Sequence, residues 1–161
     1  MASTVDQNFE QLSYGSPSLS QVRNLARKVI GDAVATRTLT IKESGSVILL
    51  DAAAVVYTLP TPSIGMNFEF RTTVTATAGK VLTNLATEFL LGALSIQTIA
   101  TVTPAGFAAN GTTIRSILTN GTTTGGLSGD KFTLTAISAT QWLVEGMLIG
   151  SGILVTPFAT S

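Results

Sequence analysis

The sequence contains no histidine and no cysteine, and it has only nine basic and nine acidic side chains among 161 residues. Without cysteine no disulfide can form, so stability must come from packing and subunit contacts. The imidazoles and thiolates that most often bind metals, move protons or attack carbonyl groups are also missing. We therefore expect a protein that presents binding surfaces, not an enzyme, and we expect no cofactor.

The charge is balanced to a formal net value of zero, which argues against nucleic acid or an anionic membrane as a partner. No apolar run approaches the roughly 20 residues of a spanning helix, and residues 1–14 lack the features of a signal peptide. We expect a soluble protein made in the cytoplasm. Its mean hydropathy is high for a soluble monomer, which favours assembly with other subunits.

The composition changes near residue 36, which predicts two parts. Residues 1–35 are expected to form an extended arm and a short amphipathic helix, because apolar side chains recur at helical spacing from Leu19 to Ile30. Gly31 suits the position after the helix end. An isolated helix of this length is marginal in water, so it needs a surface to pack against.

Residues 36–161 are predicted to form one all-β domain, an antiparallel β-sandwich. Threonine and β-branched residues alternate with apolar ones, and Gly, Pro and Asn-Gly turns interrupt them at short intervals. The predicted strands are 37–43, 46–51, 54–59, 67–77, 80–84, 88–91, 93–103, 113–119, 131–137, 141–147 and 152–156. No fixed-period repeat is visible. The echo of Asn-Gly-Thr-Thr at 110–113 and 120–123 is better explained as the two ends of one hairpin than as a solenoid.

The acidic residues are scattered, so no catalytic or metal-binding set is evident. Asp130 beside Gly129 is the nearest candidate for an all-oxygen calcium site, but the glycine-rich stretch 125–131 is better interpreted as a turn. Glu69 is expected to face solvent and to form a structural ion pair with Arg71, two residues along the same strand face. Trp142 is favoured as a core or interface residue over a sugar-stacking platform.

Two segments resemble small β-rich virion proteins of tailed bacteriophages, especially capsid decoration (cement) proteins. The first comprises residues 44–52 (SGSVILLDA) and 57–70 (YTLPTPSIGMNFEF), and the second comprises 129–136 (GDKFTLTA), 141–146 (QWLVEG) and a closing Gly152 to Phe158. Together they cover about half of the chain. Phage tail and fibre proteins use the same pattern of strand, proline-rich turn and strand.

The resemblance implies a jelly-roll-like sandwich, a homotrimer, seated on the capsid exterior where subunits of the major capsid protein meet. Such a protein bridges these subunits and stabilises the shell. The arm and helix are then the expected docking segment, because an arm gains avidity through many weak contacts across a lattice. The residues expected to dock are Phe9, Leu12, Tyr14, Leu19, Val22, Arg23, Arg27 and Lys28.

Two alternatives stay open. Arg23, Arg27 and Lys28 share one helical surface, which is either simply solvated or docked on an acidic patch of a partner. The whole protein is alternatively a phage tail or fibre module, or a module that binds a host glycan with Trp142 or Tyr57 as the stacking ring. Burial of Trp142 would argue against that glycan site.

Overall fold

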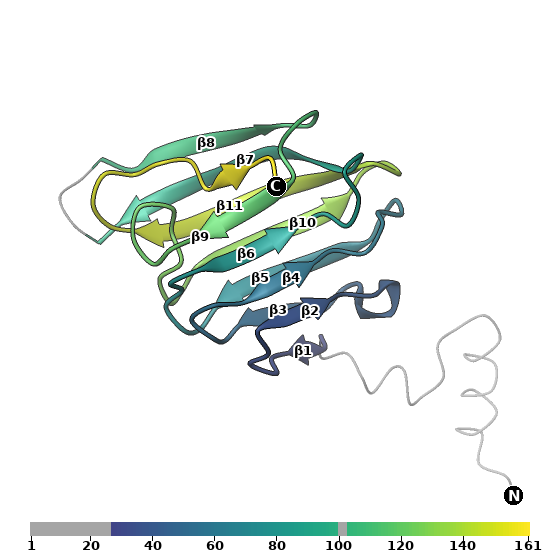
Figure 1. Cartoon of the computed structure of the whole chain (residues 1–161), viewed down its shortest axis with the longest axis horizontal. Coiled ribbons are helices and arrows are strands. Elements are labelled where there is room, and N and C mark those ends of the chain that lie inside the picture. The colour runs from purple at the N-terminus through teal and green to yellow at the C-terminus, as the bar shows by residue number, and fades with distance from the viewer. Residues whose placement is uncertain (1–26, 100–102) are drawn as a thin grey trace, which may run out of the picture.

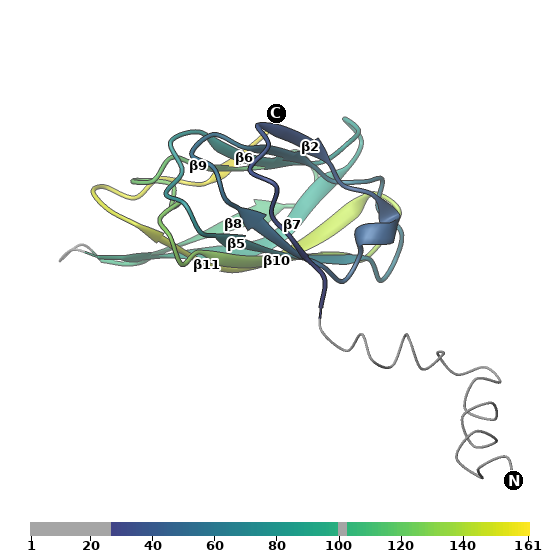
Figure 2. The same ribbon diagram turned by 90° about the horizontal axis from the view of Figure 1, so that it is seen from below.

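The computed structural model describes residues 27–99 and 103–161, which form two β-sheets lying face to face (Figures 1 and 2). In spatial order, the large sheet consists of β1 (Val29–Ile30), β3 (Val47–Leu50), β5 (Asn67–Thr72), β10 (Lys131–Ala136), β11 (Gln141–Gly150), β7 (Phe89–Thr98) and β8 (Ala105–Asn110). The small sheet consists of β12 (Phe158–Ala159), β9 (Ser116–Thr119), β6 (Gly79–Leu82), β4 (Val56–Thr58) and β2 (Thr36–Thr38). The prediction of an all-β sandwich is confirmed at this level.

The first six strands form a parallel stack that the sequence did not reveal. The chain alternates between the sheets, so that β1, β3 and β5 pair in parallel in the large sheet and β2, β4 and β6 do so in the small one. Aligned positions are about 20 residues apart, the spacing of a solenoid coil. Ile30, Ile48 and Phe70 form one row across the coils and are all buried.

The remaining strands complete the sheets mainly by antiparallel pairing. Five of the ten strand pairs are antiparallel and five are parallel, so the predicted antiparallel sandwich is correct for half of the pairs. The prediction that the two Asn-Gly-Thr-Thr motifs are the ends of one hairpin is wrong, because β8 and β9 belong to different sheets. Each motif instead turns the chain at the end of its own strand.

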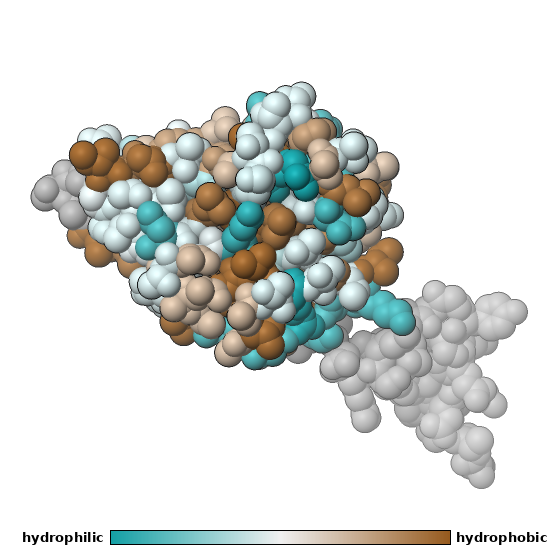
Figure 3. Space-filling view, viewed as in Figure 1, coloured by the Kyte–Doolittle hydropathy of each residue, from teal (hydrophilic) through white to brown (hydrophobic). Residues whose placement is uncertain are grey.

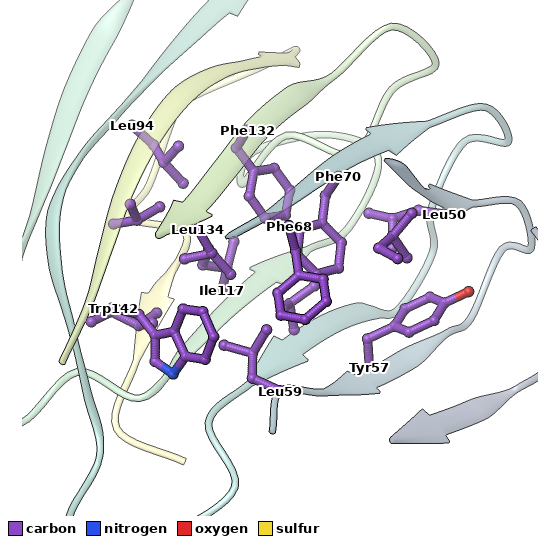
Figure 4. Packing of buried hydrophobic residues seen from close by; sticks show 14 of the residues in the cluster. Leu50, Tyr57, Leu59, Phe68, Phe70, Leu94, Ile117, Phe132, Leu134 and Trp142 are labelled. Carbon is purple, nitrogen blue, oxygen red and sulfur yellow. The ribbon is translucent and has the colours of Figure 1, made fainter. Parts of the chain in front are cut away.

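Aromatic side chains fill the space between the sheets (Figure 4). The rings of Phe70 and Phe132 stack with their centroids 5.0 Å apart, and Tyr57 meets the Phe70 ring edge-on at 6.2 Å. Phe68 packs against Trp142 at 5.9 Å. Each such pair contributes about 1 kcal/mol beyond the area it buries. Residues from both the parallel stack of β1 to β6 and the later strands therefore share one core.

Several predicted boundaries move. Residues 41–43 form the 3₁₀ helix η1 (Ile41–Glu43) instead of continuing β2. The predicted strands 88–91 and 93–103 join into β7, while β8 and β12 were missed and 152–156 is not a strand. Val29–Ile30 is β1, not the last turn of a helix, so the sandwich begins before residue 36. The rest of the predicted helix, residues 18–26, lies outside the described residues.

Candidate functional site

The structure describes two of the predicted docking residues, Arg27 and Lys28. Phe9, Leu12, Tyr14, Leu19, Val22 and Arg23 lie outside the described residues. Arg27 and Lys28 immediately precede β1 at the edge of the large sheet. They therefore mark the place where residues 1–26 join the sandwich, and their contacts define how that junction is held.

Arg27 fastens this junction to the sheet with its whole guanidinium group. Its Nε donates to the carbonyl of Gly45 at 3.0 Å, Nη2 donates to the carbonyl of Ser46 at 3.3 Å, and Nη1 contacts the Glu69 carboxylate at 2.5 Å. The backbone contributes as well, because the Val47 amide donates to the Lys28 carbonyl at 2.8 Å. A mechanical force on residues 1–26 would therefore be transmitted through these contacts to β3 and β5.

Glu69 is the centre of a charged group on the outer face of the large sheet. Besides Arg27, its carboxylate pairs with Arg71 Nε at 2.6 Å and with Lys131 Nζ at 3.8 Å. The register between β5 and β10 places Lys131 opposite Arg71, which brings the three cations together. We call this group the cation cluster: Arg27, Arg71 and Lys131 around Glu69. Its summed formal charge is positive, because three half-exposed cations surround one carboxylate.

The electrostatics of Glu69 follow from this arrangement. Burial by itself would raise the pKa of the carboxyl, but the hydrogen bonds from Arg27 and Arg71 outweigh burial and hold the pKa below its ordinary value. The predicted Glu69–Arg71 ion pair is confirmed. The expectation that Glu69 faces solvent is wrong, because Glu69 is only 7% exposed and Arg27 reaches it from a different part of the chain.

Lys131 is a member of the cluster that sequence reasoning missed. Alternation along 131–136 indicates that Lys131 points away from the core, but only the pairing of β10 with β5 brings it beside Arg71. A hollow of about 300 Å³ lies next to it, lined by Lys131, Glu145 and Met147 among others. Gly146 also lines the hollow, and a Cβ there would lie 2.5 Å from the Lys131 carbonyl oxygen.

Asp130 acts as a structural group. Its carboxylate accepts hydrogen bonds from the amides of Gly126 at 2.6 Å and Ile149 at 2.5 Å, which ties the glycine-rich turn to β11. Burial raises the pKa of Asp130 to about 6, although the two amide bonds act in the opposite direction. Within residues 27–99 and 103–161, no three His, Cys, Asp or Glu side chains gather into a group that could hold a metal ion.

The two Asn-Gly-Thr-Thr motifs form matching turns, as predicted. Asn110 Oδ1 accepts from the amides of Thr112 and Thr113, both at 3.0 Å, and Asn120 Oδ1 accepts from the Thr122 amide at 2.9 Å. The glycine that follows each asparagine has φ +74°, a conformation that glycine adopts without strain. These motifs are explained by backbone geometry alone.

Neither aromatic ring proposed for ligand stacking is accessible. Trp142 and Tyr57 are both completely buried, and the Tyr57 hydroxyl donates to the Leu49 carbonyl at 3.2 Å. Burial raises the pKa of Tyr57 to about 12. The stacking hypothesis for these two residues is therefore wrong, whereas the interpretation of Trp142 as a core residue is confirmed.

No protein-family model, curated protein or solved structure matches the chain. In the part of the chain that the structure describes, no helix has the length and apolar character needed to cross a membrane.

Proposed function

We propose that this protein is a structural virion protein that binds the outer surface of a phage capsid. In this role it bridges subunits of the major capsid protein and stabilises the shell, after synthesis in the host cytoplasm. It works by binding and catalyses no reaction. The observation that carries the proposal is the junction at Arg27, where a 26-residue N-terminal segment joins the edge of the large sheet through three side-chain contacts.

The physical basis is thermodynamic linkage. A ligand that binds only the assembled lattice stabilises that lattice in proportion to its occupancy and affinity. A tether transmits load between capsid subunits only if its root is fixed, and Arg27 fixes it through three separate groups. The half-exposed cations of the cluster give the same face an attraction for acidic side chains of a partner.

The resemblance supports the finer parts of the proposal, which are the jelly-roll-like form and the homotrimer. The two packed sheets agree with the two-layer architecture of a jelly-roll-like form. The parallel pairs, which include β1–β3, β3–β5 and β7–β11, depart from the antiparallel strand order of a jelly roll. The glycan-binding alternative has lost both of its proposed stacking rings, so no observation now favours it.

The test is cosedimentation with capsids that lack the protein. A variant without residues 1–26 keeps β1 and the junction, and we expect it to fold but to lose capsid binding at least tenfold. Arg71→Glu is expected to weaken binding at low salt, whereas Lys42→Glu, an exposed cation outside the cluster, serves as its matched control. Undiminished decoration by the truncated protein would contradict the proposed role of the N-terminal segment.

A further inference from the structure

Two long segments of the chain contain no charged residue: 89–114 and 146–161. The fold brings them together, because β7 pairs with β8 on one side and with β11 on the other, and β12 contacts β8 from the small sheet. We call this region the uncharged flank: β7, β8, residues 146–150 of β11 and residues 151–161. It forms the end of the molecule opposite β1 and β2 (Figure 1).

The flank ends in an unprotected strand. β8 pairs with β7, and no other strand of the described residues pairs with its outer side. Its sequence, AGFAAN, contains neither charge nor proline. Soluble proteins usually protect such edges with lysine, proline, bulges or very short strands, because a free edge pairs readily with another chain. The outer side of β8 therefore has six residues without a strand partner among the described residues, of which Ala109 is buried.

An apolar tip adjoins this edge. Ile153 is 83% exposed and Ile99 is 72% exposed, and the Ile99 amide donates to the Gly150 carbonyl at 3.3 Å at the end of β11. Figure 3 shows hydrophobic side chains gathered at this end of the molecule, beside the loop that follows β11. On the outer face of the large sheet, exposed Ala93 and Ala108 pair with each other and have small side chains, so a second backbone can approach them closely. Exposed Glu145, opposite Ala93, marks the charged boundary of this face.

We propose that the uncharged flank is the self-association surface of this protein, covered by the flank of another copy. The absence of charged side chains favours a second copy of this chain as the partner of this surface. Identical patches that carry net charge repel one another when they meet, whereas a patch without charge meets its own copy at no such cost, and subunit interfaces are depleted of charge at their core. The cation cluster, centred on β5, would repel its own copy, and its member nearest the flank is Lys131, opposite Met147. The inference supplies the contact for the proposed homotrimer but does not depend on capsid binding.

The mass of the full-length protein in solution tests this inference. Light scattering after size exclusion at about 100 µM should give a dimer or a trimer of the 16.6 kDa chain. Gly106→Lys places a charge on β8, where a new Cβ meets no atom within 4 Å, so the monomer accommodates it. Ile153→Asp charges the tip. Both variants should raise the dissociation constant at least tenfold.

Matched controls lie at the other end and on the other sheet. Thr38→Lys puts the same charge on the exposed edge strand β2, and Ile64→Asp puts the same carboxylate on an isoleucine that is 77% exposed. Ile64 lies at the far end of the sheet, because the neighbouring Gly65 amide donates to Ala136, opposite the start of β11. Both controls should keep the mass of the unmodified protein.

A second measurement does not depend on affinity. The chain has no cysteine, so a single Ala108→Cys substitution gives a clean crosslinking probe. Mild oxidation should join two copies through position 108 but not through Thr38→Cys. A monomer at about 100 µM, or flank variants that stay assembled while the controls dissociate, would overturn the inference. Cosedimentation of the same proteins reports on the proposed function separately, since an assembled protein can still fail to bind capsids.

Discussion

The two ends of the strand stack differ in how their edges are finished. At the β1/β2 end the strands have two and three residues, and Arg37 pairs with Asp32 and Glu43 while Arg27 pairs with Glu69. At the β8/β12 end the large sheet stops at a six-residue strand with no charge. Short strands with ion pairs resist further pairing, whereas a long uncharged edge invites it. The β1/β2 end, which we call the closed end, therefore resists pairing with another strand, whereas the β8/β12 end is open to it.

The net charge of zero conceals this contrast. Glu43, Glu69, Glu88 and Asp130 are all buried and satisfy backbone amides or cations inside the molecule. Most cations remain at least partly exposed. Among the described residues the exposed charge is therefore more basic than the composition indicates. Exposed Lys131 and Glu145 lie beside the flank, opposite Met147 and Ala93.

The largest expected effect is a loss of stability on substituting Gly92, where β7 of the flank pairs with β11. Gly92 of β7 has φ +123°, and a Cβ there would lie 2.2 Å from the Val144 carbonyl. Gly92→Ala is expected to cost about 3 kcal/mol or more of unfolding free energy, because β7 and β11 must separate or strain. Urea unfolding measures this loss. Gly106→Ala, in open space on β8, should change stability by less than about 0.5 kcal/mol.

A smaller effect is expected at the closed end. Arg27→Ala removes three hydrogen bonds and leaves the buried Glu69 with Arg71 and Lys131 alone. The expected loss is about 2 kcal/mol in chemical unfolding, since hydrogen bonds to a charged group contribute about that much. Lys28→Ala, whose side chain is exposed, is the control and should be nearly neutral. Equal losses in both variants would show that the Arg27 contacts do not hold the junction.

Two sets of buried carboxylates should also respond oppositely to pH. The pKa of Asp130 is raised to about 6 in the folded protein, so the folded state binds more protons than the unfolded chain, and stability falls as pH rises through this range. The pKa values of Glu43 and Glu69 are lowered, so their stabilisation is lost as pH falls below about 4. Thermal unfolding should show a maximum between these limits.

From pH 7.5 to pH 5 the expected gain is about 1 kcal/mol, and Asp130→Asn should abolish that gain. The variant keeps a side-chain oxygen for one of the two amides but has no proton to gain. A profile of Asp130→Asn that still rises between pH 7.5 and pH 5 would assign the effect to another group.

Salt concentration should have the smallest effect on the stability of the protein. The cations of the cluster are half-exposed, so 1 M NaCl screens their attraction for Glu69 and is expected to lower stability by less than about 1 kcal/mol. The Arg27→Ala variant should lose less than the unmodified protein over the same range. Assembly through the uncharged flank should persist at high salt, and dissociation there would contradict an interface without charges.

Local chemistry was sufficient for several features of the fold. Period-two alternation of apolar with polar residues predicted β10 and all of β5, although the predicted strand 67–77 continued past the end of β5 at Thr72. The Asn-Gly pairs predicted both turns, because these signals depend on residues close together in the chain. The Glu69–Arg71 pair also followed from spacing along one strand. β8 was missed because AGFAAN consists mainly of small residues with weak strand preference.

The tertiary structure decided which distant segments became neighbours. Parallel pairing of β1, β3 and β5 requires only apolar residues at equivalent positions, so Ile30, Ile48 and Phe70 align without any repeated sequence. Strand order also decides that Glu69 is buried and that Lys131 lies beside it. The uncharged flank is likewise made from two segments separated by more than thirty residues. Composition and alternation determine that this chain forms sheets, whereas pairing partners depend on the balance of long-range contacts, which local preference does not encode.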